Sequence, residues 1–281
     1  MKEVLTRSLS GLLFIGVIIG SIIWSQYSVA IVFLAVSIFA LYEFYKLMNT
    51  AGFTPHKITG LLCGITIYGL LALHSFNWLP LHTLSIIFPL LVVIVIVELF
   101  RKQKYPISNI AFTVLSMIYI VMPLASLNYF AYYNPFNDEV HLYKNEYSLL
   151  LGFFIIVWCN DTGAYVFGRL LGKHKLFNRI SPNKTWEGFF GGCLLAISGA
   201  ILFSMATDSS TVHWSIISVL IVIFGTLGDL TESQIKRSIG VKDSGKFMPG
   251  HGGILDRFDG VLYAAPFVLT YFLLIKAESL I

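Results

Sequence analysis

Acidic residues in two groups flank a stretch rich in lysine, arginine and glycine near the C-terminal end of the sequence. Residues 228–260 read GDLTESQIKRSIGVKDSGKFMPGHGGILDRFDG. If the preceding apolar segment continues as a helix, spacings of three and four place four polar residues on one face: Asp229, Glu232, Ser233 and Lys236. Gly240 then predicts the end of that helix. Asp256 and Asp259, three residues apart, predict a second acidic face where the next apolar segment begins.

This combination of side chains predicts a site for metal-bound nucleotide chemistry. Converging carboxylates repel one another unless a cation holds them, and Mg²⁺ prefers such oxygen ligands together with substrate phosphates. Basic side chains neutralise phosphate charge, and glycine lets the backbone approach a polyphosphate closely. The residues concerned are Lys236, Arg237, Lys242, Lys246, Arg257, Gly245, Gly250, Gly252 and Gly253.

Simpler interpretations stay open for single members of this cluster. Any one lysine could belong to a solvated loop with scattered ion pairs. Asp259 could favour the dipole at a helix N-terminus, and His251 could either contact phosphate or hydrogen-bond its own turn. The cluster as a whole favours the nucleotide site.

A second basic stretch, residues 181–188, reads SPNKTWEG. Pro182 and Asn183 favour a turn, and Lys184 and Thr185 have side chains that can reach phosphate oxygens. The alternative is a positively charged anchor with Trp186 at the membrane interface. By contrast, the sequence of residues 168–174, GRLLGKH, does not have the spacing of a phosphate-binding loop.

Asn160 and Asp161 lie near the middle of an apolar segment. A carboxylate is costly in lipid, so Asp161 is expected to face the bundle interior, a cavity or a partner cation. It either helps to build a metal or substrate site or forms a structural ion pair.

Membrane-spanning helices are the elements that position these residues. Of the 281 residues, 56% are hydrophobic and only 12% are charged, whereas a soluble domain carries about a quarter charged residues. A spanning helix needs about 20 mostly apolar residues. Nine segments are predicted to span: 9–25, 29–48, 58–76, 84–100, 110–133, 149–171, 188–206, 213–230 and 261–275. The first is basic before its apolar run and lacks a cleavage site, which favours a helix over a signal peptide, and Pro123 predicts a kink in the fifth.

The distribution of basic residues predicts the orientation of these spans. With the N-terminus in the cytoplasm and the C-terminus outside, the cytoplasmic segments hold all of the 19 lysines and arginines except Lys144 and Lys276. The two long connections that carry the candidate chemistry, 169–187 and 229–260, are then cytoplasmic. We therefore expect an all-α polytopic membrane protein with an N-terminal region of five spans, 1–147, and a C-terminal catalytic region of four spans, 148–281.

The C-terminal segment resembles the signature of the phosphatidate cytidylyltransferase (CDP-diacylglycerol synthase) family. The resemblance rests on Ser233-x-Ile-Lys-Arg, Lys242-Asp243-Ser-Gly, Pro249-Gly-His-Gly-Gly and Asp256-Arg-Phe-Asp259, which occur at fixed spacing. Met248, where the family has another apolar residue, is a mild departure. The runs at 181–188 and 160–165 are also similar to family segments, and the nine-span layout agrees over essentially the whole chain.

The resemblance implies a dimeric, all-helical enzyme of phospholipid biosynthesis with its active site in the C-terminal half. It would transfer CMP from CTP to phosphatidate and release pyrophosphate. We expect catalytic roles for Asp229, Asp256, Lys236 and Arg257. Metal ligands are expected at Asp229 and Asp256, with contributions from Asp161 and Asp259. Substrate contacts are expected at Ser181, Asn183, Lys184, Thr185, Ser233, Arg237, Lys242, Asp243 and His251.

The expected cofactor is Mg²⁺, and the sequence leaves open a second metal or a monovalent cation. The expected partners are CTP, phosphatidate, membrane lipid and a second copy of the chain, with no nucleic acid. The simple architecture favours the cell (inner) membrane. Two alternatives carry different chemistry: a related enzyme, either a CTP-using lipid kinase or a cytidylyltransferase for an isoprenoid lipid, and a transporter. The absence of a repeated half in the sequence argues against the transporter.

Overall fold

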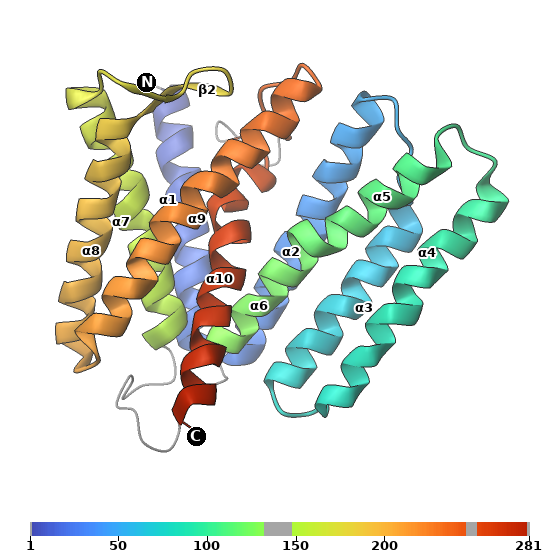
Figure 1. The fold of residues 1–281 in the computed structure, drawn as a ribbon, viewed down its shortest axis with the longest axis horizontal. Coiled ribbons are helices and arrows are strands. Elements are labelled where there is room, and N and C mark those ends of the chain that lie inside the picture. Colours follow the sequence, from blue (N-terminus) through green and yellow to red (C-terminus); the bar gives the residue numbers. More distant parts are fainter. Residues whose placement is uncertain (1, 132–147, 246–251, 280–281) are drawn as a thin grey trace. The chain divides into compact units, whose positions relative to one another are not determined.

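The computed structural model describes residues 2–131, 148–245 and 252–279, most of them in helices (Figure 1). The helices in chain order are α1 (Lys2–Trp24), α2 (Gln26–Thr50), α3 (Lys57–Ser75), α4 (Ile87–Arg101), α5 (Pro106–Ser116), α6 (Met122–Ala131), α7 (Ser148–Leu171), α8 (Trp186–Thr207), α9 (Thr211–Ser238) and α10 (Leu255–Ser279). A 3-10 turn, η1 (Leu81–Ile86), precedes α4, and a π-helical turn, η2 (Met117–Val121), joins α5 to α6.

Within the described residues, eight helical segments are long and apolar enough to cross a membrane, and Ser10–Trp24 is a shorter apolar helix. The eight correspond to the second to ninth predicted spans. Large apolar side chains on α4, among them Phe88, Leu99 and Phe100, are exposed, as a surface in contact with lipid requires. The chain is an all-α, multi-pass integral membrane protein, and the count of nine spans stays a prediction.

Local sequence explains where several helices begin. The Ser25 hydroxyl accepts a hydrogen bond from the Ser28 backbone, and the Ser28 hydroxyl accepts one from the Ser25 backbone, a reciprocal cap that starts α2. The Thr185 hydroxyl caps α8 by accepting from the Gly188 amide at 3.1 Å.

The fifth predicted span departs from regular α-helix immediately before Pro123. Because proline lacks an N–H, it removes one hydrogen bond of the preceding turn. The structure places η2, a π-helical turn, at Met117–Val121 directly before it, where the extra residue changes the helical register. The predicted irregularity therefore takes the form of a π turn.

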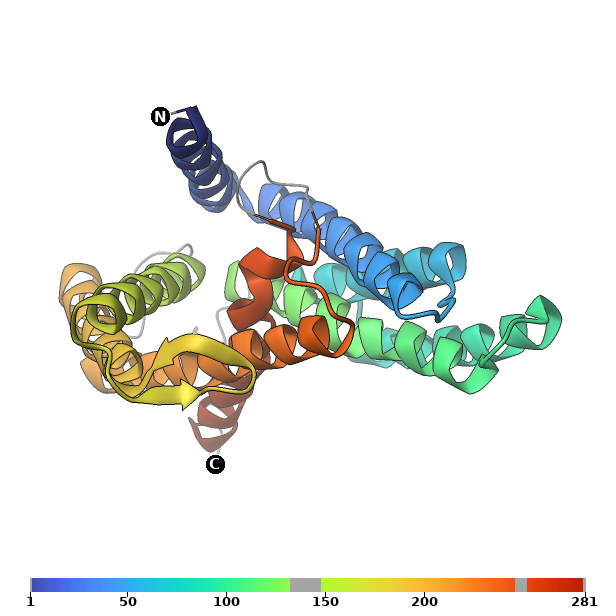
Figure 2. The same ribbon diagram turned by 90° about the horizontal axis from the view of Figure 1, so that it is seen from above.

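The loop predicted at 169–187 contains a small β-hairpin, which the all-α expectation missed. Strands β1 (Lys175–Phe177) and β2 (Ser181–Thr185) pair antiparallel, with Lys175 opposite Thr185 and Phe177 opposite Ser181. Figure 2 shows the hairpin in yellow between the end of α7 and the start of α8. The pairing satisfies backbone groups that an irregular loop would leave to water.

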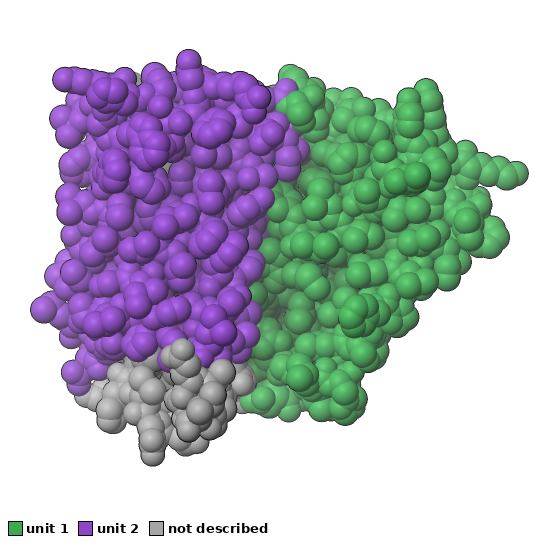
Figure 3. Space-filling model, in the orientation of Figure 1, with its two compact units in different colours: residues 1–129, 238–258 green, residues 130–237, 259–281 purple. Residues whose placement is uncertain are grey.

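The chain divides into two compact units, coloured separately in Figure 3. Unit 1 comprises residues 1–129 and 238–258, and unit 2 comprises residues 130–237 and 259–281. The segment 238–258 is grouped with the N-terminal helices in unit 1. Its hydrogen bonds to α2, described below, provide the physical reason.

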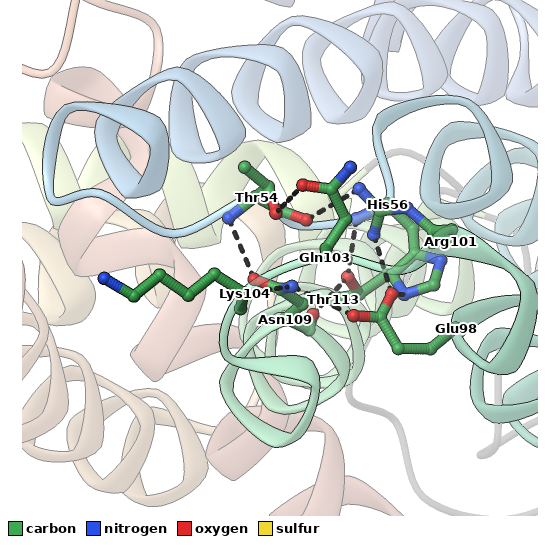
Figure 4. A network of polar contacts seen from close by, with 8 residues as sticks. All are labelled: Thr54, His56, Glu98, Arg101, Gln103, Lys104, Asn109 and Thr113. Carbon is green, nitrogen blue, oxygen red and sulfur yellow. Dashed lines mark hydrogen bonds and ion pairs between the residues drawn. The ribbon is translucent and has the colours of Figure 1, made fainter.

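A buried polar network joins one end of α4 and α5 to the connection after α2 in unit 1 (Figure 4). Glu98 is its centre: its Oε1 accepts from Asn109 Nδ2 at 2.9 Å and its Oε2 accepts from Arg101 Nη1 at 3.0 Å. The Nε2 of His56 lies 2.8 Å from the same Oε2, and Arg101 also donates to the Thr54 carbonyl at 2.9 Å. These contacts replace water for a carboxylate that is almost fully buried.

Close contact between glycines holds α7 against α8 in unit 2. A Cβ at Gly163 would lie 2.5 Å from the Gly191 carbonyl oxygen, and one at Gly192 would lie 2.6 Å from the Asn160 side chain. Small residues allow such close backbone approach between membrane helices. Gly188 and Gly192, four residues apart on α8, both lie at this contact.

One sequence expectation about the membrane surface needs correction. Trp24, Trp78 and Trp214 fall at the outer ends of predicted spans, where indole rings favour the membrane interface, and the first two are exposed. Trp214 is instead fully buried in unit 2, with its Nε1 donating to Ser209 Oγ at 2.9 Å. Within the described part of the chain, no atom outside the local helix backbone lies within 4 Å of a Cβ at Gly16 or Gly20 of α1, a spacing typical of helix packing.

Candidate active site

The polar face predicted after the eighth span is formed by the last turns of α9 in unit 2. Helix α9 continues to Ser238, and Gly240 follows with a positive φ of 76°, as a helix stop requires. Ser233 Oγ donates to Asp229 Oδ1 at 3.3 Å, and Lys236 Nζ lies 2.5 Å from Glu232 Oε2. Glu232 and Lys236 are buried, so Lys236 already neutralises a carboxylate of its own helix.

Lys184 and Asp229 form an ion pair in unit 2, between Nζ and Oδ2. Lys184 lies on β2, and Asp229 lies where α9 leaves the predicted span, 45 residues later in the chain. Both side chains are partly exposed. The basic stretch 181–188 and the acidic face of α9, predicted separately from the sequence, therefore meet in space.

Two further aspartates approach this pair in unit 2. The Asp259 carboxylate, on α10, interacts electrostatically with Asp229, Lys184 and Asp161. Its Oδ1 accepts a hydrogen bond from the Gly260 amide at 2.7 Å. Asp161 lies on α7, and its side chain is exposed. Three carboxylates from three helices thus share one electrostatic neighbourhood with one lysine.

A glycine allows α9 and α10 to bring these carboxylates together. A Cβ at Gly228 would overlap the Asp259 carbonyl oxygen and would lie 3.1 Å from Tyr263 Cβ. Gly225, one turn earlier, has its nearest atom at 4.0 Å. The two helices therefore come into direct contact beside Asp229, which is the residue after Gly228.

The acidic cluster has the donor chemistry of a Mg²⁺ site. All of its donors are carboxylate oxygens, which Mg²⁺ prefers, and Mg²⁺ is commonly held by one or two carboxylates plus substrate phosphates. Among the described residues, no three His, Cys, Asp or Glu side chains are arranged to hold one metal ion. The residues fit a metal that is completed by substrate oxygens, and not a closed protein cage.

Asp256, the other predicted metal ligand, lies in the part of the family motif that belongs to unit 1. The signature segment means here the described residues 242–245 and 252–257, and Asp256 organises it. Its Oδ2 accepts from the Gly253 amide at 2.7 Å, and its two oxygens accept from the Ser244 amide at 3.2 and 3.1 Å. Asp256 lies in the first turn of α10, where a carboxylate also favours the helix dipole. This carboxylate therefore joins two backbone segments on either side of residues 246–251.

A model of the cytidylyltransferase family matches residues 5–275 of the chain. The chain belongs to this family. A Staphylococcus epidermidis protein named phosphatidate cytidylyltransferase is 38% identical over 230 residues, which cover 81% of this chain and 84% of the relative. Proteins of the same name from Staphylococcus aureus and Staphylococcus haemolyticus are 35% and 42% identical over 235 and 167 residues. These matches cover 82% and 59% of this chain, and 85% and 60% of the two relatives.

In this cytidylyltransferase-family chain, the remaining predicted phosphate-binding residues differ in exposure. Arg237, Lys242, Asp243, Arg257 and Asn183 are exposed, and Ser181 is half-buried. Thr185 is buried and its hydroxyl serves as the cap of α8, so a phosphate contact there would compete with the cap. His251 and Lys246 lie outside the described residues.

Glu43 of α2 is a site candidate that the sequence analysis did not identify. The structure places it in the interior of unit 1, where its Oε2 accepts from the Leu255 amide at 2.9 Å and from Ser244 Oγ at 3.3 Å. The available signal was a lone carboxylate inside an otherwise apolar helix. Its partner segment lies far away in the sequence, so spacing alone did not reveal the contact.

Proposed function

We propose that the chain transfers CMP from CTP to phosphatidate, giving CDP-diacylglycerol and pyrophosphate for phospholipid biosynthesis. One observation carries the proposal: Lys184 of the hairpin pairs with Asp229 of α9, next to Asp259, in a chain of the cytidylyltransferase family. The names of the staphylococcal relatives support phosphatidate as the acceptor.

The reaction is an in-line displacement at phosphorus. A phosphate oxygen of phosphatidate forms a bond to the α-phosphorus of CTP, and the bond from that phosphorus to the bridging oxygen of pyrophosphate breaks. A phosphate monoester is mostly dianionic at neutral pH, because its second pKa is about 6. The enzyme therefore needs no strong general base, and its task is to bring two anions together and to stabilise the leaving pyrophosphate.

Basic side chains carry out this task in our proposal. Lys184 can exchange its contact with Asp229 for a phosphate oxygen, because both groups are partly exposed. Exposed Arg237, Lys242 and Arg257 would orient phosphates and offset their charge. Lys236 would act from its ion pair with Glu232, and Ser233, Ser181, Asn183, Thr185, Asp243 and His251 are the further candidate substrate contacts.

Asp229 and Asp259 are the residues that would hold Mg²⁺, with Asp161 as an additional contributor. When bound, the metal would act as a Lewis acid and template for the CTP phosphates. Asp256 remains a candidate ligand as well as the organiser of the signature segment. A second metal or a monovalent ion is compatible with the number of carboxylates.

We further propose nine spans with the N-terminus in the cytoplasm and the C-terminus outside. The distribution of lysine and arginine supports this orientation. The candidate active site would then face the cytoplasm at the cell (inner) membrane, where CTP and a lipid headgroup can both arrive. The homodimer expected from the family resemblance is part of the same proposal.

The test is a transfer assay with detergent-purified protein, CTP labelled in the cytidine, phosphatidate and Mg²⁺. Labelled lipid that requires phosphatidate, together with released pyrophosphate, is the expected result. Released CDP with phosphate moved to an alcohol acceptor would instead support a CTP-using lipid kinase. Labelled lipid only with an isoprenoid phosphate would change the acceptor and leave the transfer chemistry in place.

A further inference from the structure

Glu43 of α2 is a buried carboxylate whose hydrogen-bond donors come from the signature segment. Only 5% of the residue is exposed. Its Oε2 accepts from the Leu255 amide at 2.9 Å and from Ser244 Oγ at 3.3 Å. Its Oε1 is also buried and has no hydrogen-bond partner among the described residues. A buried carboxylate is costly unless hydrogen-bonded, so these donors at the ends of the segment are what make the position of Glu43 tolerable.

Two glycines let the backbone of the segment close over this carboxylate. A Cβ at Gly245 would overlap Glu43 Oε1, and a Cβ at Gly253 would overlap Glu43 Oε2 and Ser244 Oγ. Neither glycine has a positive φ. They are therefore needed for space at the contact with Glu43, and not for an unusual backbone conformation.

Asp256, on α10, contacts the same two backbone stretches as Glu43. It accepts from the amides of Ser244 and Gly253, while Glu43 accepts from the Ser244 hydroxyl and the neighbouring Leu255 amide. Two carboxylates, one from α2 and one from α10, thus fix residues 244–245 and 253–255. The exposed side chains of Lys242, Asp243 and Arg257 lie directly beside these fixed points in the sequence.

We propose that Glu43 is a positioning residue for substrate binding. It holds residues 244–245 and 253–255 in place, so that the charged side chains beside them are preorganised to contact the nucleotide phosphates. The proposal rests on the cytidylyltransferase function proposed above. Substrate affinity falls in proportion to the population of the binding-competent arrangement. Loss of Glu43 should therefore raise KM for CTP more than it lowers kcat.

The first test compares Glu43→Gln with wild type in lipid nanodiscs. Glutamine keeps the size of the side chain but loses the charge that strengthens the hydrogen bonds, so KM for CTP should rise about tenfold. The matched control is Tyr45→Phe. Tyr45 lies on the same helix as Glu43, and the change removes its buried hydrogen bond with Ser116 Oγ. The control should lower Tm and leave KM unchanged. An equal KM for Glu43→Gln and wild type would overturn the proposal.

A double-mutant cycle tests the contact itself. Gly245→Ala places a methyl group against Glu43 and should impair transfer, whereas adding Glu43→Ala makes room for that methyl group. The combined loss should be smaller than the product of the two single losses, by about tenfold or more. Independent losses would mean that Glu43 does not contact the segment as proposed.

Limited trypsin digestion separates failure of this proposal from failure of the proposed function. Cleavage after the exposed Lys242 should be faster in Glu43→Gln than in wild type, without any substrate. If Glu43→Gln is cleaved faster than wild type but the wild-type protein transfers no CMP, the positioning role is supported and the proposed function is overturned. Equal cleavage rates in an active protein would overturn the positioning role alone.

Discussion

Lys184 of β2 and Asp229 of α9 form an ion pair between two parts of unit 2 that carry different sequence motifs. Asp259 and Asp161 add negative charge to the same neighbourhood. The single lysine therefore offsets part of a carboxylate cluster that would otherwise repel phosphates. This role distinguishes it from the exposed basic residues of the signature segment.

Replacing Lys184 by methionine should reduce kcat/KM for CTP by about 100-fold, the loss typical of removing one charge-stabilising donor. Stability should change little, because the Lys184 and Asp229 side chains are 26% and 37% exposed and exposed ion pairs contribute little. Steady-state transfer assays and thermal unfolding measure the two effects. Normal kcat/KM in Lys184→Met would remove this lysine from the mechanism.

Asp256→Asn should abolish turnover and also loosen the signature segment. Asparagine offers one acceptor oxygen where the carboxylate uses two for the Ser244 and Gly253 amides. A stability loss of about 1–3 kcal/mol should accompany the loss of activity, with helical content unchanged. Asp208→Asn is a suitable control, since Asp208 has a positive φ of 55° that asparagine tolerates. An active, Mg²⁺-dependent Asp256→Asn enzyme would contradict this role.

Two alanine substitutions on α9 should have opposite outcomes. A methyl group at Gly228 meets the Asp259 backbone, whereas one at Gly225 has its nearest atom at 4.0 Å. Gly228→Ala should cost about 1–3 kcal/mol through overpacking and should impair transfer, because it separates α9 from α10 beside Asp229. Gly225→Ala should retain stability and activity. Thermal unfolding and transfer assays on both variants check this, and equal behaviour would mean that α9 and α10 do not approach at Gly228.

Acidification below neutral pH should destabilise the protein through His56. Burial and the nearby Arg101 guanidinium lower the pKa of His56 from its ordinary 6.5, while Glu98 acts in the opposite direction. The unfolded state therefore binds more protons than the folded state below about pH 6.5, so stability is present above that pH and is lost as pH falls. Tm measured between pH 7.5 and 5.5 should fall more for wild type than for His56→Gln. The same slope in both proteins would assign the acid sensitivity to other groups.

The membrane architecture was largely predictable because the bilayer imposes a simple rule on each segment. A run of apolar residues such as 29–48 has to be helical to satisfy its backbone in lipid, and α2 spans Gln26–Thr50. The polar face at Asp229 and the stop at Gly240 were also predictable, because both depend on residues close together in the sequence. Both predictions are confirmed by α9.

The features that sequence reasoning missed depend on distant partners. The β1–β2 hairpin has short strands that contain only two residue types enriched in strands, Phe177 and Thr185, so the local sequence signal is weak. Trp214 is typical of an interface residue, but its environment in unit 2 buries it. The donors of Glu43 could not be found from local spacing, because the segment that supplies them follows about 200 residues later. The predicted ligand set for a metal stays a prediction.

The hydrogen bond from Leu255 to Glu43 also sets an order on biosynthesis. The two residues are 212 positions apart, and a ribosome adds about 5–20 residues per second. At least about 10 s therefore pass between the synthesis of Glu43 and the synthesis of the donors that bind it in the finished protein. During that interval water or lipid headgroups have to solvate the carboxylate, which favours a location for this end of α2 near the membrane surface. A segment made 212 residues after Glu43 thus completes the interior around it.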